Sequence, residues 1–172
     1  MKKHLSILAL ALGMTLSFAG YGQQKIGHID AEKLLQMMPE TKLAQEQIET
    51  YGRQLEKDMT DMEAELELKI QQFRRDDAMM TNLSRETRTR EIQELQARIQ
   101  EYGMKAQEEL QNKQVELLTP IIEKATNAVK EVADEGKYSY ILDSSQSKAV
   151  VIYQENGDDI LEKVKKKLGI TE

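Results

Sequence analysis

Residues 44–73, with the sequence AQEQIETYGRQLEKDMTDMEAELELKIQQF, decide the fold. Eleven residues complete three helical turns, so an apolar pattern that repeats every 11 residues predicts a long helix with a straight or slightly right-handed stripe. Three such series occur here, with steps of three and four between them: Ala44, Leu55 and Leu66; Ile48, Met59 and Ile70; and Tyr51, Met62 and Phe73.

A second apolar stripe follows further along the chain. Its members are Ile92, Leu95, Ile99, Tyr102, Ala106, Leu110 and Leu117, which are three or four residues apart up to Leu110 and seven apart at the last step. The pattern lapses at residues 77–83, and Ser84 is suited to be the N-cap of a following helix. We therefore predict two antiparallel helices that meet at a tip near residues 77–83.

Two prolines bound this helical region. Between Pro39 and Pro120 there is no other proline, and the only glycines are Gly52 and Gly103. Helices of about 40 residues extend for roughly 60 Å, which is more than the diameter of a compact domain of this length. We expect residues 39–119 to form an arm that projects from a smaller body. Gly52 and Gly103 are candidate hinges because glycine weakens a helix, and tolerated sequence drift without a functional role is the alternative.

The two ends of the chain predict this body, which comprises residues 23–38 and 120–172. Short β-rich segments occur at residues 26–30, 138–142 and 149–153, and a last helix follows Asp158 or Asp159 and ends at Gly169. The predicted class is α+β. Because so small a sheet rarely stands alone, we expect subunits to share it. The candidate oligomerisation residues are Ile26, Ile29, Ile141, Leu142, Val150, Val151 and Ile152.

The first 22 residues resemble a secretory signal peptide. Lys2 and Lys3 form a basic head, residues 5–18 are an apolar run, and Gly22 ends a segment of small residues suited to cleavage. The apolar run is shorter than the roughly 20 residues that cross a bilayer, so an uncleaved anchor is the less favoured alternative. We expect export to the periplasm.

Composition excludes several kinds of chemistry. The 172 residues include no cysteine and two histidines, so thiolate catalysis, disulfides and zinc fingers are excluded. With 24 basic and 30 acidic residues, the chain is unsuited to general nucleic-acid binding. Residues 143–147 begin like a calcium loop, but Lys148 and Gln154 replace the glycine and glutamate that such a loop requires. We interpret His28 as a sheet or interface residue, and we predict no enzyme activity and no cofactor.

Several segments resemble the Skp/OmpH family of periplasmic chaperones. They are the opening segment at residues 29–35, Met38-Pro39-Glu40, residues 114–124, Val132-Ala133, residues 138–143 and the terminal segment 158–169. The resemblance implies a homotrimer with a shared β-barrel body and three helical arms around a cavity. It also implies an ATP-independent holdase that carries unfolded outer-membrane proteins across the periplasm.

The candidate client-binding residues are Met59, Met62, Met79, Met80 and Leu83. Methionine is unbranched and polarizable, so it adapts to varied apolar partners. Ordinary packing between the two helices is the alternative for Met59 and Met62.

The tip is also locally basic, with arginines at Arg74, Arg75, Arg85, Arg88 and Arg90. These side chains are candidates for steering clients or for transient contact with an anionic membrane surface, and a solvated face with ordinary salt bridges is the alternative. A second functional class, a structural or tethering hairpin of the cell envelope, also fits the long helices.

Overall fold

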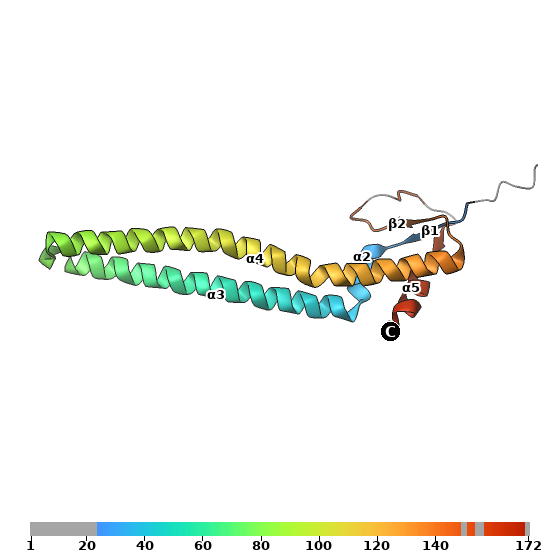
Figure 1. Cartoon of the computed structure of the whole chain (residues 1–172), viewed down its shortest axis with the longest axis horizontal. Coiled ribbons are helices and arrows are strands. Elements are labelled where there is room, and N and C mark those ends of the chain that lie inside the picture. Colours follow the sequence, from blue (N-terminus) through green and yellow to red (C-terminus); the bar gives the residue numbers. More distant parts are fainter. Residues whose placement is uncertain (1–23, 149–150, 154–156, 171–172) are drawn as a thin grey trace, which may run out of the picture. The chain divides into compact units, whose positions relative to one another are not determined.

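The computed structural model describes residues 24–148, 151–153 and 157–170 (Figure 1). The predicted signal peptide and Val150 lie outside these residues. The elements are, in chain order, β1 (Ile26–Ile29), α2 (Ala31–Met37), α3 (Pro39–Asp76), the 3-10 turn η2 (Asp77–Met79), α4 (Asn82–Gly136), β2 (Tyr140–Asp143), β3 (Asp158–Asp159) and α5 (Leu161–Leu168). The predicted combination of long helices and a small sheet is confirmed.

The chain divides into two compact units. The helix unit comprises Glu32–Asn127, and the sheet unit comprises the described residues up to Ala31 and from Ala128 onward. Helix α4 is continuous through Pro120, although proline removes one backbone hydrogen bond from a helix interior. The functional division into arm and body at Pro39 and Pro120 stays a prediction.

In the helix unit, α3 and α4 are antiparallel neighbours (Figure 1). Polar contacts join the two helices, and they pair increasing residue numbers on α3 with decreasing residue numbers on α4. These contacts are Tyr51 to Glu109 at 2.5 Å, Asp58 to Tyr102 at 3.3 Å, Lys69 to Glu91 at 3.5 Å and Asp76 to Arg88 at 3.0 Å.

The two predicted apolar stripes form the seam between these helices. All nine stripe residues of α3 and all seven of α4 are buried or half-buried. Ala44 and Leu95 are the most enclosed, at 4% and 3% exposed. Most of the other seam residues keep part of their surface in solvent, because two helices cannot cover each other's full circumference. The periodicity of the sequence thus identified the packed face of each helix.

The N-cap predicted at Ser84 is wrong. Helix α4 begins at Asn82, and the Ser84 N–H donates a hydrogen bond to Thr81 Oγ1 at 3.2 Å. Thr81 therefore provides the capping hydroxyl, three residues before the predicted position. Both residues offer the same chemistry, so only the geometry of the turn from η2 distinguishes them.

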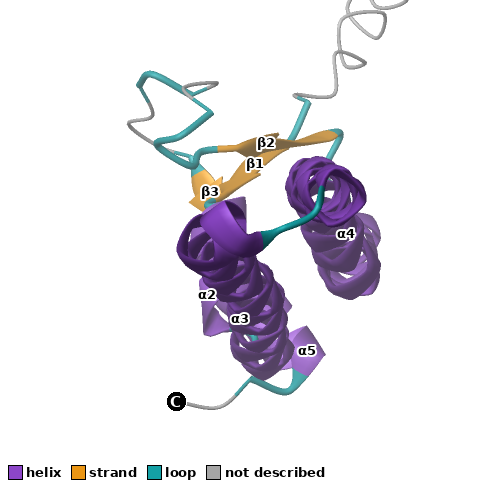
Figure 2. Ribbon diagram, turned by 90° about the vertical axis from the view of Figure 1, so that its left-hand side faces the viewer, coloured by secondary structure: helices purple, strands orange, loops and turns teal. Residues whose placement is uncertain are grey.

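The sheet unit contains a three-stranded parallel sheet in the order β2-β1-β3 (Figure 2). Ile26 pairs with Tyr140 and His28 with Leu142 on one side, and Gly27 pairs with Asp158 on the other. Gly27 permits this close pairing, because a Cβ atom there would lie 2.9 Å from Ile141 Cδ1.

The prediction of a strand at residues 149–153 is wrong for residues 151–153, which are the part of this segment that the structure describes. Residues 151–153 have no strand geometry, and residues 149 and 150 lie outside the described part of the chain. The second edge of β1 instead pairs with β3, which consists of Asp158 and Asp159. β-Branched composition favoured residues 149–153, but pairing with a distant strand decides which segment joins a sheet.

Helix α5 ends as predicted. Its first turn is capped by Asp159, whose Oδ1 accepts a hydrogen bond from the Leu161 N–H at 2.9 Å. Gly169 ends the helix with a φ of 70°, a left-handed conformation that glycine adopts without steric cost. Ile160, Leu161 and Val164 are buried and form part of the core of the sheet unit.

Candidate functional site

The predicted client-binding residues fall into two environments. Met59 and Met62 are half-buried in the seam, and Met59 faces Gly103, where an added Cβ would lie 3.9 Å from its Sδ atom. At the turn, Met79 is 86% exposed and Leu83 is 75% exposed, whereas Met80 is half-buried. The seam methionines therefore contribute to packing, and Met79 and Leu83 are accessible to a partner.

Most of the arginines near the turn have carboxylate partners. Arg85 bonds to Asp77 at 2.8 Å, Arg88 to Asp76 at 3.0 Å, Arg90 to Glu86 at 3.0 Å and Arg75 to Asp76 at 3.4 Å. Arg74 makes no ion pair within the described residues. Exposed pairs of this kind are individually weak, so a stronger anionic partner could displace them.

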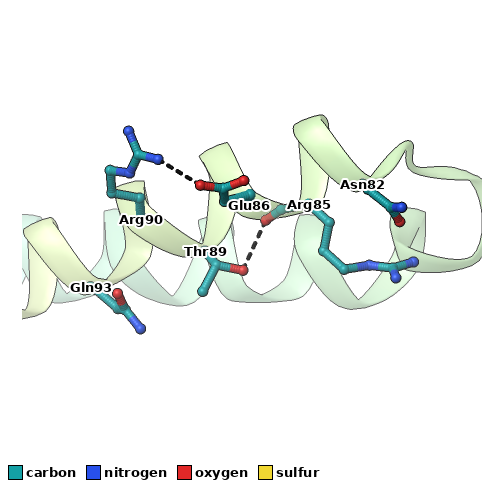
Figure 3. A pocket seen from close by; sticks show the side chains of 6 residues that line it. All are labelled: Asn82, Arg85, Glu86, Thr89, Arg90 and Gln93. Carbon is teal, nitrogen blue, oxygen red and sulfur yellow. Dashed lines mark hydrogen bonds and ion pairs between the residues drawn. The ribbon is translucent and has the colours of Figure 1, made fainter.

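A shallow pocket lies beside this turn, on the first turns of α4 (Figure 3). Its lining is polar: Asn82, Arg85, Glu86, Thr89, Arg90 and Gln93. Figure 3 shows that Arg90 and Glu86 bond to each other and that the Thr89 hydroxyl donates to the Arg85 carbonyl, 2.8 Å away. Because these groups bond within the helix itself, the pocket has the character of a solvated surface.

The two candidate hinge glycines lie opposite apolar side chains of the partner helix. An added Cβ at Gly52 would lie 3.7 Å from Leu110 Cδ1, an ordinary contact distance. Each glycine follows a tyrosine that bonds across the seam, Tyr51 to Glu109 and Tyr102 to Asp58. The bond from Tyr51 to the Glu109 carboxylate raises the pKa of Tyr51, and burial together with Asp58 raises that of Tyr102. Neither glycine interrupts its helix.

The oligomerisation candidates include exposed apolar residues of the sheet. Ile26 is 48% exposed and Leu142 is 39% exposed, whereas Ile29 is buried and Ile141 is half-buried. Ile152 is 95% exposed and Val151 is half-buried. Tyr140, which the sequence analysis did not single out, is 58% exposed beside Ile26 in the strand register.

His28 is buried in β1, as expected for a sheet residue. Its Nδ1 lies 3.3 Å from the Ser144 hydroxyl oxygen. The carboxylate of Asp143, next to Ser144, accepts hydrogen bonds from the backbone N–H groups of Ser145 at 3.0 Å and Ala31 at 3.4 Å. Burial would raise the pKa of Asp143, but these bonds outweigh it, so the pKa is lowered. Within the described residues there is no cluster of three or more side chains that could hold a metal ion.

A cluster of lysines in the sheet unit was missed by sequence reasoning, because its members are distant in the chain. Lys25, Lys163, Lys166 and Lys167 line a pocket with Tyr138 and Glu135. Hydrogen bonds from Tyr138 and Lys163 lower the pKa of Asp158 to about 2. Lys25 lies 3.9 Å from the centre of the Tyr138 ring, and Lys167 bonds to Glu135 at 2.6 Å. Most of the positive charge is therefore already paired.

The long helices and parallel sheet described above match a known protein family. The family model for the OmpH-like outer membrane proteins matches residues 25–168, so this chain belongs to that family. Chaperone protein Skp of Photorhabdus luminescens is 25% identical over 171 residues, covering 98% of this chain and 99% of the relative. Chaperone protein Skp of Yersinia enterocolitica is 24% identical over 168 residues, covering 98% and 99%.

A solved structure supports the same fold. It is that of an OmpH-like protein from Caulobacter crescentus, with a TM-score of 0.72 and 15% identity, covering 87% of this chain and 86% of that one. Among the described residues no helix is long and apolar enough to cross a membrane. The family and the names of the relatives together support a chaperone role.

Proposed function

We propose that this protein is an ATP-independent holdase of the periplasm that binds unfolded outer-membrane proteins and prevents their aggregation. The observation that carries the proposal is the membership of the OmpH-like family together with exposed apolar side chains on the helix unit. Holding an unfolded chain requires accessible apolar surface and no chemistry, since the client is released unchanged. Met79 and Leu83 provide such surface at the turn between the helices.

We further propose that the protein is a homotrimer and that the sheet is completed between subunits. Ile26, Tyr140 and Leu142 lie on one face of the sheet, since side chains alternate along a strand and these residues occupy matching register positions. All three are more than a third exposed. The register places the buried His28 on the same face, so this face is covered in part and exposed at the three apolar residues. Exposed apolar surface on a sheet of three short strands is suited to association with further copies.

The function is tested by light scattering of a denatured outer-membrane β-barrel protein diluted into buffer without nucleotide. The protein is expected to suppress aggregation at stoichiometric amounts, and ATP is expected to have no effect. Aggregation that is unchanged by an excess of the protein would contradict the proposal. Native mass measurement of the same sample tests the trimer, and Tyr140→Ser with Leu142→Ser is expected to shift the mass toward the monomer.

The contribution of the turn is tested separately. Met79→Ser with Leu83→Ser is expected to weaken suppression of aggregation several-fold while leaving the oligomer mass unchanged, because both side chains are exposed and unneeded for packing. Ala64→Ser, at an exposed position on α3, is the matched control. Unchanged suppression in the double variant would remove the turn from the client-binding surface.

Export is the remaining part of the proposal. Mass spectrometry of protein recovered from the periplasm is expected to show a chain that begins after Gly22. A full-length mass, or recovery in the cytoplasm alone, would contradict a cleaved signal peptide.

A further inference from the structure

Helix α4 has a second stripe of residues, three and four apart, outside the seam. We define the neutral stripe as the following ten residues: Gln93, Ala97, Gln100, Met104, Gln107, Gln111, Val115, Leu118, Ile122 and Thr126. None of them is charged, although 31% of the whole chain is. Nine of the ten are exposed, and Leu118 is half-buried. The neutral stripe extends for about 50 Å at 1.5 Å per residue.

The apolar members of the neutral stripe are poorly placed for a solvated surface. Met104 is 69% exposed, Val115 is 59% exposed and Ile122 is 48% exposed. They recur on one face of a helix, so their exposed surface is collected along one line. Apolar side chains gathered in this way commonly mark an interaction site.

The glutamines of the neutral stripe add hydrogen-bonding capacity without charge. Each side-chain amide offers two donors and two acceptor lone pairs. An unfolded polypeptide has backbone N–H and C=O groups that lack the partners a sheet or helix would provide. Amides that alternate with apolar side chains therefore match an extended client chain better than they match a folded, charged surface.

Along the middle of the neutral stripe the nearest charges on α4 are negative, whereas Arg90 and Lys130 occupy the equivalent positions beside its two ends. Glu94, Glu101 and Glu108 are each three residues before or four residues after a member of the stripe, and all three are exposed. Glu101 bonds to Lys105 at 2.6 Å. For Glu94 and Glu108 no ion pair is found in the part of the chain that the structure describes. We call Glu94, Glu101 and Glu108 the acidic row. Arg98 and Lys105 lie on the side of the acidic row that faces away from the neutral stripe.

We propose that the neutral stripe is a client-docking surface that favours unfolded segments in which apolar residues are accompanied by lysine or arginine. The inference deepens the holdase function proposed above and rests on it. The apolar residues supply affinity, the amides accept and donate to the client backbone, and the acidic row selects the charge beside the apolar residues. Electrostatic complementarity of this kind sets partner choice and association rate more than total affinity.

Two synthetic peptides test the charge preference. They share one apolar core sequence, and lysines flank the core in one peptide whereas glutamates flank it in the other. At low salt the lysine peptide is expected to bind about tenfold more tightly, and the difference should shrink at higher ionic strength. Equal affinity of the two peptides, or tighter binding of the glutamate peptide, would overturn the proposed preference.

Two sets of variants locate the preference on α4. Glu94→Gln, Glu101→Gln and Glu108→Gln together are expected to reduce the tenfold difference to about twofold or less. The matched control replaces three exposed glutamates of α3, Glu46, Glu49 and Glu67, by glutamine and is expected to preserve the difference. The same effect from both sets would show that only the total charge of the protein matters, and would overturn the assignment to the acidic row.

The apolar part is tested with Met104→Ser, Val115→Ser and Ile122→Ser, and with Leu43→Ser and Leu68→Ser on α3 as the control. Leu43 and Leu68 are each 58% exposed, so the two sets remove comparably accessible apolar surface. The first set is expected to weaken binding of both peptides at least fivefold, and the control less than twofold. Circular dichroism identifies any variant that fails to fold.

The failure of the inference can be distinguished from the failure of the proposed function. If the wild-type protein neither binds the peptides nor protects a denatured β-barrel protein, the holdase function is wrong. If it protects the β-barrel protein and the α4 triple variant protects it equally well, the holdase function stands and the neutral stripe is not its docking surface.

Discussion

The outer faces of α3 and α4 differ in chemistry although the helices pair along the same seam. On α3, one series of exposed positions at steps of three and four comprises Lys42, Glu46, Glu49, Arg53, Lys57, Thr60, Ala64, Glu67, Gln71 and Arg75, of which seven are charged. Arg53 bonds to Glu49 at 2.6 Å and Lys57 to Asp61 at 2.5 Å. The neutral stripe of α4 has no charge over the same number of positions.

This difference shows that exposure alone does not identify a solvated face. Ion pairs four residues apart on α3 stabilise that helix locally and keep its outer face hydrated. The neutral stripe of α4 lacks such pairs and presents apolar side chains instead, so it contributes little to the fold of the isolated chain. A helix face that does not stabilise the chain is free to serve a partner.

The largest expected effect distinguishes the seam of α4 from its neutral stripe. Leu95→Ala should lower the free energy of unfolding by about 2–4 kcal/mol, because Leu95 is almost fully buried in the seam. Val115→Ala should change it by less than about 0.5 kcal/mol, because Val115 is exposed. Urea unfolding followed by circular dichroism measures both values. Similar losses from the two substitutions would show that the stripe is packed in the native protein.

A second prediction concerns variants that introduce charges into the neutral stripe, so that it resembles the charged outer face of α3. Gln100→Glu, Met104→Arg and Gln107→Lys together should weaken binding of the lysine-flanked peptide about tenfold, since burying a charge without a partner opposes docking. Helix content should remain unchanged, because these residues are good helix formers at exposed positions. Fluorescence titration of the labelled peptide measures the effect, and binding within twofold of wild type would break the contrast between the two faces.

A third prediction compares one glycine from each helix. Gly52→Ala and Gly103→Ala should each raise the free energy of unfolding by about 0.5–1 kcal/mol, because alanine has the higher helix propensity and both added Cβ atoms meet ordinary contact distances. If the glycines are hinges, the double variant should also narrow the distribution of maximum dimensions in small-angle scattering. An unchanged distribution would argue against the hinge while leaving the stability effect intact.

The smallest expected effect concerns the ion pairs of α3. Arg53→Gln removes the exposed pair with Glu49 and should lower the free energy of unfolding by no more than about 0.5 kcal/mol. Peptide binding should stay within twofold of wild type, because the outer face of α3 is not assigned to clients. A large loss of binding would place a client contact on α3 and would remove the distinction between the helices.

Local sequence predicted what depends on local periodicity. The 11-residue repeat from Ala44 to Phe73 predicted nine buried or half-buried residues on the seam of α3, and Gly169 marked the end of α5 through its conformational freedom. The strand at residues 26–29 was also predicted closely. In these cases the physical cause lies within a few turns or residues, so the sequence alone was informative.

The sequence-based predictions failed where two chemically equivalent groups could fill one role, or where a distant segment decided the pairing. Thr81 and Ser84 offer the same hydroxyl, and only the path of the turn made Thr81 the cap. The β-rich segment at residues 149–153 was preferred to Asp158 and Asp159, although β1 pairs with the latter. The neutral stripe is not evident from apolar periodicity, because its signal is the absence of charge at residues such as Gln100 and Gln107.

Photo-crosslinking measures whether clients contact the neutral stripe of α4 in preference to the outer face of α3. A photoreactive amino acid is introduced at Met104 of α4 or, separately, at Arg53 of α3, both at exposed positions of the helix unit. Each protein is then irradiated with a denatured outer-membrane β-barrel protein under conditions in which aggregation is suppressed. Strong crosslinks to the client are expected from position 104 and few from position 53. Equal yields from the two positions, or crosslinks mainly from position 53, would contradict docking on the neutral stripe.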